Sequence, residues 1–376
     1  MICKKLGSPM AGLALVVVMF TASCSASEQE PTSVPSMSTA MVEPTATLSL
    51  TEIAVQMTLL NPTPRGYVSI AYDIESDRVI LFGGQTGNIK DPTVYDGETW
   101  AFDTTAGKWT QMKPSSAPSG RSAAELVYDV ESDRVILFGG ADENVWGLSD
   151  TWAYDFNTNS WKEMAKGPEH HLGDRLVYDA ESDRVVLFGG YGFGFSDGLY
   201  NDTWVYDLNS DTWTEMKPDI SPPGRNYQAM TYDSRSDLVL MWGGADLSGS
   251  YYDSIWSYDF NTNTWKELKP TQGSVPRGRD YPAMVYDANS DRTILFGGSL
   301  GGNETWAYDY NTNTWTQLEP GTVPGKLSRH AMVYNPLAHQ IILFGGQVGF
   351  REFIYTLETW AYDYTTNTWM NITPFQ

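Results

Sequence analysis

One segment recurs six times along this chain, at intervals of 48 to 56 residues, and this repetition constrains the fold more than any other feature. A clear copy reads YDVESDRVILFGG over residues 128–140, followed after a loop by DTWAYDFNTNSWKEM over residues 150–164. The paired glycines are Gly83-Gly84, Gly139-Gly140, Gly189-Gly190, Gly243-Gly244, Gly297-Gly298 and Gly345-Gly346. Each pair is followed by two tryptophans nine residues apart: Trp100/Trp109, Trp152/Trp161, Trp204/Trp213, Trp256/Trp265, Trp306/Trp315 and Trp360/Trp369. Repeats of this length built from short strands are typical of propeller blades.

Each copy divides into four predicted strands. Strand a precedes the Tyr-Asp pair, as in Tyr281 to Tyr286, and strand b is the apolar run before the glycines, as in Arg134 to Phe138. Strand c is the alternating Thr-Trp-Ala-Tyr-Asp run, and strand d carries the second tryptophan. The turns between them are rich in Asp, Asn and Ser, which favour tight bends. The sequence therefore predicts an all-β chain of four-stranded units.

The order Arg…Tyr-Asp…Gly-Gly…Trp…Trp, read from Arg65 to Thr373, resembles the kelch motif. That resemblance implies a six-bladed β-propeller of four-stranded antiparallel kelch blades, a fold of both binding modules and enzymes. The propeller is expected over residues 65–376, with blades at 65–113, 121–165, 171–217, 225–269, 279–319 and 327–373. For the outer strand of the last blade, the segment around Trp369 is favoured over a possible strand at residues 53–58.

The first residues resemble an export signal. Lys4 and Lys5 precede an apolar run, Leu13 to Phe20, that is too short to span a bilayer as a mature helix. Thr21-Ala22-Ser23-Cys24 resembles the lipobox of bacterial lipoproteins, although an ordinary secretory signal is the alternative. We expect a signal peptide at residues 1–23, acylation at Cys24, and a protein exported and lipid-anchored to the cell envelope, on its periplasmic or extracellular face.

The amino-acid composition predicts a stalk before the repeats and argues against one class of partner. Residues 24–64 are rich in Ser, Thr, Pro and Met, which predicts a flexible stalk. The net charge is −22, which argues against nucleic acid as a partner because phosphates require Lys/Arg surfaces. The two cysteines, Cys3 and Cys24, lie before the repeats, so the propeller contains neither a disulfide nor a thiol.

The loops between strands b and c are the most variable part of the repeat. They hold 14, 10, 12, 10, 6 and 12 residues and, together with the d–a loops, emerge on one face of a propeller. Aromatic residues gather in them, and Trp146 lies outside the repeat pattern. Aromatic loops on a rigid scaffold predict a binding face. The candidate binding residues in these loops are Trp146, Tyr191, Phe193, Phe195, Tyr251, Tyr252, Phe350 and Phe353.

Four arginines stand seven residues before the tyrosine that ends strand a: Arg65, Arg121, Arg225 and Arg279. Their recurrence favours a structural role, and the third and sixth copies carry His171 and Leu327 instead. An arc of arginines in an acidic protein could also hold a carboxylate. Arg121, Arg225 and Arg279 are therefore also counted among the candidate binding residues.

No cofactor, metal or catalytic residue is assigned. The Asp155-x-Asn157-x-Asn159 run opens like a calcium loop, but the glycine and the glutamate that such a loop needs are missing. Turn chemistry explains it. No pair of histidines has a spacing typical of metal ligands.

The leading hypothesis is a non-catalytic cell-surface binding protein that recognises a carbohydrate or a protein partner through the b–c and d–a loop face. The alternative is an enzyme: the chain resembles the six-bladed bacterial sialic-acid mutarotases, which implies a sugar mutarotase or epimerase acting on a carboxylated sugar. Glu125 would then serve as an acid or base. Galactose oxidases also resemble this fold, but their crosslinked cysteine has no counterpart here. A second alternative is a structural subunit of an envelope complex.

Overall fold

The computed structural model describes residues 61–87, 94–169, 171–192, 198–300, 302–349 and 354–374. The chain divides into two compact units, residues 1–47 and 48–376, and all described residues belong to the second. Cys24, the possible strand at 53–58, and Phe193, Phe195, Phe350 and Phe353 lie outside the described residues.

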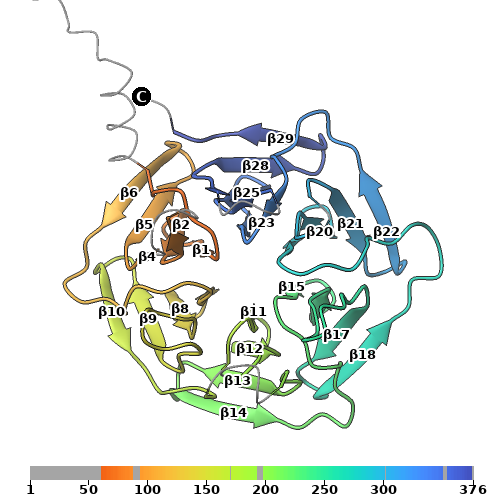
Figure 1. The fold of residues 1–376 in the computed structure, drawn as a ribbon, viewed down its shortest axis with the longest axis horizontal. Coiled ribbons are helices and arrows are strands. Elements are labelled where there is room, and N and C mark those ends of the chain that lie inside the picture. Colours follow the sequence, from red (N-terminus) through yellow and green to blue (C-terminus); the bar gives the residue numbers. More distant parts are fainter. Residues whose placement is uncertain are drawn as a thin grey trace, which may run out of the picture. The chain divides into compact units, whose positions relative to one another are not determined.

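Six four-stranded antiparallel sheets form the ring shown in Figure 1, which confirms the six-bladed propeller. Blades 1 to 3 consist of β1 (Ser69–Asp73), β2 (Arg78–Phe82), β5 (Thr99–Asp103) and β6 (Lys108–Met112); β7 (Glu125–Asp129), β8 (Arg134–Phe138), β9 (Thr151–Asp155) and β10 (Ser160–Glu163); and β11 (Arg175–Asp179), β12 (Arg184–Phe188), β13 (Thr203–Asp207) and β14 (Thr212–Met216). Blades 4 to 6 consist of β15 (Ala229–Asp233), β16 (Leu238–Trp242), β17 (Ile255–Asp259) and β18 (Thr264–Leu268); β19 (Ala283–Asp287), β20 (Arg292–Phe296), β21 (Thr305–Asp309) and β22 (Thr314–Leu318); and β24 (Ala331–Asn335), β25 (Gln340–Phe344), β28 (Thr359–Asp363) and β29 (Thr368–Asn371).

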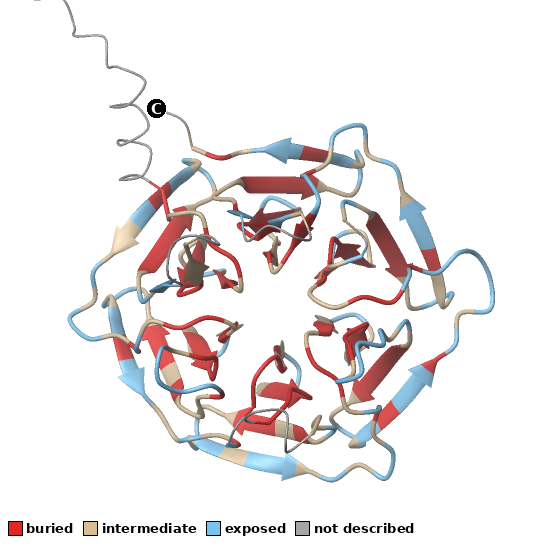
Figure 2. Ribbon diagram, viewed as in Figure 1, coloured by how far each residue is buried: buried red, intermediate tan, exposed pale blue. Residues whose placement is uncertain are grey.

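Short additional strands lie in the loops. They are β3 (Gln85–Thr86), β4 (Val94–Tyr95), β23 (Leu327–Ser328), β26 (Gln347–Val348) and β27 (Ile354–Tyr355). In Figure 2 the inner strands of each blade are largely buried, whereas the outermost strands alternate between buried and exposed residues. A strand covered on both faces favours the continuous apolar runs seen in strand b, and a strand with one solvated face favours alternation.

Adjacent blades are joined by one repeated aromatic contact. The aromatic residue that ends strand b meets the outer tryptophan of the next blade, with ring centroids 4.8 to 6.0 Å apart. At five of the six junctions the indole Nε1 of that tryptophan also donates to a threonine that begins strand c of the preceding blade, at 2.9 to 3.1 Å. The exception is Trp315, because Ile255 replaces the threonine and provides no hydroxyl.

The same contact closes the ring. Phe344 of the last blade lies 4.9 Å from Trp109 of the first, and Trp109 donates to Thr359 at 3.1 Å. Strand β29, which contains Trp369, occupies the outer position of blade 6, as expected from its tryptophan. The propeller also includes residues assigned to the stalk, because Asn61 is buried and donates to the carbonyl of Pro374 at 3.4 Å.

Replacing Thr359 with Val tests the closure. The substitution keeps the shape of the side chain but leaves the buried indole N–H of Trp109 without its acceptor. We expect a loss of about 1–3 kcal/mol in the free energy of unfolding, measured by chemical denaturation. Thr110→Val, on the exposed face of β6, is the matched control and should change stability by less than about 0.5 kcal/mol. Equal effects of the two substitutions would contradict this role of the closing bond.

Candidate binding face

The b–c and d–a loops emerge on one face of the ring, and a circle of six residues surrounds the channel mouth there. Each stands two positions after the recurrent arginine or its replacement. All six have a positive φ, from 51° to 71°: Tyr67, Ala123, Gly173, Tyr227, Tyr281 and Arg329. Main-chain hydrogen bonds link neighbouring members, for example Tyr281 N to Tyr227 O at 2.9 Å. Non-glycine residues rarely adopt this backbone conformation, so the circle is held by the blades around it.

Large side chains occupy four of the six positions of this circle. The rings of Tyr227 and Tyr281 stack with centroids 4.1 Å apart, and Tyr67 meets Tyr281 edge-on at 5.5 Å. The guanidinium of Arg329 lies 4.2 Å from the centroid of Tyr281 and 4.7 Å from that of Tyr67. Burial raises the pKa of Tyr227 and of Tyr281 well above the usual tyrosine value, so both hydroxyls stay neutral.

The other two positions hold the small residues Ala123 and Gly173, and a cavity of about 260 Å³ opens on this side of the circle. Its lining includes Ala123 from the circle, Tyr95 and Ala141 from the loops, and two of the predicted binding residues, Trp146 and Tyr191. Gly173 is required at its position, because an added Cβ would lie 2.7 Å from the ring of Tyr227. The cavity therefore results from a departure from the repeat.

The predicted aromatic residues have different environments. Trp146 is 49% exposed at the rim of the cavity, whereas Tyr191 is buried and shares a hydrogen bond of 3.1 Å with the hydroxyl of Tyr227. Tyr251 is 36% exposed in the loop of blade 4. Tyr252, in the same loop, is partly buried and lies over the guanidinium of Arg225, 4.2 Å from the ring centroid.

The arginines lie below the face. Arg121, Arg225 and Arg279 are at most 1% exposed, and each donates to a glycine carbonyl 18 residues further along the chain. Arg121 and Arg279 also pair with Asp150 and Glu304, which precede strand c of their own blades. These hydrogen bonds and ion pairs stabilise the loops from beneath. Because the arginines are buried there, they do not form the expected arc along the binding face.

The sequence does not predict four residues of the circle as part of the binding face: Tyr67, Tyr227, Tyr281 and Arg329. The available signal was their constant spacing of two residues from the arginine position. Their identities vary between copies, and the positive φ that turns them into one circle depends on the assembled ring.

Glu125 lies deeper, inside the central channel, and forms an ion pair with Arg175 of the next blade. Burial raises the pKa of Glu125 to about 7 despite this partner. The surrounding cavity of about 110 Å³ also includes His330, whose pKa burial lowers to about 3. Small-molecule sites usually occupy about 300–1,000 Å³, so this cavity gives the mutarotase alternative no support.

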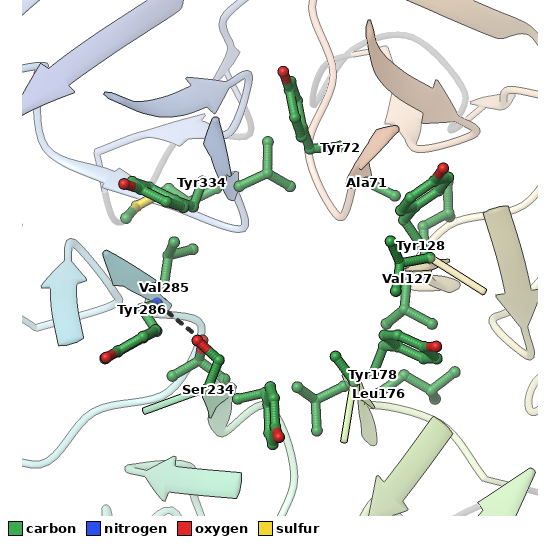
Figure 3. A pocket seen from close by; sticks show the side chains of 18 of the residues that line it. Ala71, Tyr72, Val127, Tyr128, Leu176, Tyr178, Ser234, Val285, Tyr286 and Tyr334 are labelled. Atoms are coloured by element: carbon green, nitrogen blue, oxygen red, sulfur yellow. Dashed lines mark hydrogen bonds between the residues drawn. The ribbon is translucent and has the colours of Figure 1, made fainter. Parts of the chain in front are cut away.

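The opposite face has its own opening, a cavity of about 460 Å³ lined by strand a of all six blades. Figure 3 shows the recurrent tyrosines around it, among them Tyr72, Tyr128 and Tyr178, with aliphatic residues such as Val127 between them. The hydroxyls of these three tyrosines donate to an aspartate in the following turn, at 2.9 Å. Because the same residue types recur in each copy, this lining belongs to the scaffold.

Within the described ranges, no cluster of three or more His, Cys, Asp and Glu side chains is arranged to bind a metal ion. No helix in the same ranges has the length and apolar character that crossing a membrane requires.

The repeats of this chain match a family model and are similar to several known proteins. Residues 31–219, 77–298 and 182–376 match the KLHDC2/KLHL20/DRC7 Kelch-repeats domain. An F-box/kelch-repeat protein of Arabidopsis thaliana is 25% identical over 255 residues, which are 63% of this chain and 52% of that protein. Adagio protein 3 of Arabidopsis thaliana is 28% identical over 239 residues, 60% of this chain and 37% of that protein. The Leucine-zipper-like transcriptional regulator 1 homolog of Drosophila melanogaster is 25% identical over 256 residues, 64% of this chain and 25% of that protein. The matches thus span about half or less of these relatives.

The raised pKa of Glu125 predicts a pH dependence of stability. Between about pH 4.5 and 7 the folded protein retains a proton that the unfolded chain releases. This contribution to stability is fully present below about pH 4.5 and is lost as the pH rises to about 7. The difference in unfolding free energy between the wild type and Glu125→Gln should therefore fall across this range in urea titrations. Parallel curves for the two proteins would contradict the shift.

Proposed function

Because the chain belongs to the kelch-repeat β-propeller family, whose domains mediate protein–protein interaction, we propose that it is a non-catalytic binding protein whose loop face holds a protein partner. The cavity beside Trp146 would receive an apolar or aromatic side chain of that partner. Trp146 itself, half-exposed at the cavity rim, would be the central contact.

The observation that carries this proposal is a set of exposed aliphatic side chains in the loops of the same face. The b–c loops of blades 1, 2, 4, 5 and 6 each present at least one, between 39% and 52% exposed: Val94, Val145, Leu247, Leu300, Val348 and Ile354. Aliphatic groups offer no hydrogen bonds to sugar hydroxyls, whereas they suit the apolar centre of a protein interface. A protein partner is therefore favoured over a glycan.

We further propose that the propeller is displayed on the cell envelope by an acyl group on Cys24. The support is the lipobox-like sequence before this cysteine and the export signal that precedes it. Replacing Cys24 with Ser should abolish incorporation of radiolabelled palmitate and release the protein from the membrane fraction. Unchanged labelling would contradict the anchor.

Site-specific crosslinking tests the binding face. A photoreactive benzoyl-phenylalanine at position 146, in the full chain in its host, should give a protease-sensitive adduct of higher mass. The same group in place of Leu337, which is 61% exposed on the opposite face, is the control and should give none. An adduct from the control position alone would overturn the proposal.

Affinity then measures the contribution of Trp146. With the captured partner, Trp146→Ala should weaken binding by at least about tenfold, as expected for a central aromatic contact. Leu337→Ala should leave it unchanged. Binding to a glycan array that Trp146→Ala abolishes, in the absence of a protein adduct, would instead support the glycan alternative.

A further inference from the structure

A recurrent polar arrangement lies beneath the loop face, and among the six blades only blade 4 lacks its acid. In blades 1, 2 and 5 a carboxylate before strand c accepts from both the buried arginine and the first tryptophan of the strand. In blade 3, His171 and Asp202 form the corresponding pair, 3.5 Å apart. In blade 4, Ser254 stands where the acid is expected.

Arg225 of blade 4 is consequently a buried cation without a carboxylate partner. It is 0% exposed. Its Nε donates to Pro223 O at 3.1 Å, and its Nη1 donates to Gly243 O at 3.0 Å and weakly to Ser254 Oγ at 3.4 Å. Its Nη2 has no acceptor among the described residues. Burial lowers the pKa of this guanidinium to about 10, so it remains charged at neutral pH.

A second partner of the arginine is also missing from this blade. In blades 1 and 2 the Nη2 donates at 2.9 Å to a hydroxyl two residues before the arginine, from Thr63 and Ser119. Pro223 occupies that position in blade 4 and has no hydroxyl. A buried charge without a hydrogen-bonded counter-ion is destabilising, so Arg225 differs energetically from its equivalents.

Neighbouring groups do not compensate for the missing acid. Tyr252 stacks on one face of the guanidinium and provides no acceptor in its plane, so Nη2 stays unsatisfied. Asp253 is exposed. Glu267 pairs with Lys269 at 3.1 Å and acts on Arg225 through charge attraction, without a hydrogen bond to the guanidinium. Trp256 Nε1 donates to Ser254 Oγ at 3.2 Å, so Arg225 and Trp256 converge on this position as they do on the acids of the other blades.

We propose that Arg225, Ser254 and Trp256 form a binding site for a carboxylate group supplied from outside the chain. The carboxylate accepts from Arg225 Nη2 and from Trp256 Nε1, as the internal acids do in the other blades. Its plane lies along that of the guanidinium, so the stacked Tyr252 stays in place. Entry is from solvent past Ser254 and Tyr252, which are only partly buried. The site is separate from the cavity beside Trp146 and stands independently of the proposed partner.

Ser254→Asp gives the decisive test because it supplies the missing acid from within. The melting temperature of the wild-type protein should rise with sodium formate to a plateau, at constant ionic strength, because a ligand that binds the folded state stabilises it. Ser254→Asp should already melt at a higher temperature and should no longer respond to formate. Ser254→Asn, which has the same size without the charge, is the control and should not gain that stability. Equal formate responses of the wild type and Ser254→Asp, or equal melting temperatures of the Asp and Asn variants, would overturn the proposal.

Recreating the blade 4 arrangement in blade 2 tests whether this arrangement is sufficient to bind a carboxylate. Asp150→Ser combined with Ser119→Pro leaves Arg121 and Trp152 in the same relation that Arg225 and Trp256 have in blade 4, because Arg121 then loses both its acid and its hydroxyl partner. This variant should melt at a lower temperature and show a larger formate response than the wild type. A variant that folds but shows no added response would overturn the proposal.

Two probes distinguish the source of the carboxylate. A short blocked peptide with one Asp, and its Asn counterpart, are compared with formate for stabilisation of the wild-type protein. A response to formate alone assigns the site to small carboxylates. Responses to formate and to the Asp peptide, but not to the Asn peptide, assign it to acidic side chains of a protein. The absence of any response would overturn the proposal.

Discussion

The ring depends on the contact between the aromatic residue of strand b and the outer tryptophan of the following blade. Within the described residues each blade consists of four strands of its own, and none of these strands is shared between the last blade and the first. Closure combines the ring of Phe344 against Trp109 and the indole hydrogen bond to Thr359 with main-chain bonds such as Tyr67 N to Arg329 O at 3.0 Å. Each copy therefore needs its recurrent tryptophans for assembly of the ring, and the largest differences between the copies lie in the loops.

Variation in those loops produces sites where the copies differ, and both proposed sites follow this rule. The cavity beside Trp146 exists because Ala123 is small at a position where three other copies have tyrosine. The proposed carboxylate site exists because Ser254 replaces an acid. In each case one substitution in a symmetric frame changes local volume or charge without affecting the neighbouring blades, since each blade has its own hydrogen-bonded sheet.

The repeat was sufficient to predict the blades, their strand order and the outer position of β29, because glycine pairs and tryptophans mark strand ends directly. It also identified Trp146 and Tyr191 as residues of the loop face. The burial of Arg121 and Arg279 was harder to predict, since their acid partners stand 29 and 25 residues further along the chain. The tyrosine circle could not be inferred at all, because residues from separate blades meet only once the ring closes.

The distribution of buried charge gives a last physical argument. Blade 6 is the reverse of blade 4: Leu327 replaces the arginine, while Glu358 still accepts from Trp360 at 2.9 Å. An acid without its cation is inexpensive here, because Glu358 is only partly buried and water can solvate it. Water cannot solvate a fully buried cation such as Arg225 in the same way. The asymmetry between these two blades explains why the altered pair in blade 4, and not that in blade 6, creates an affinity for an external group.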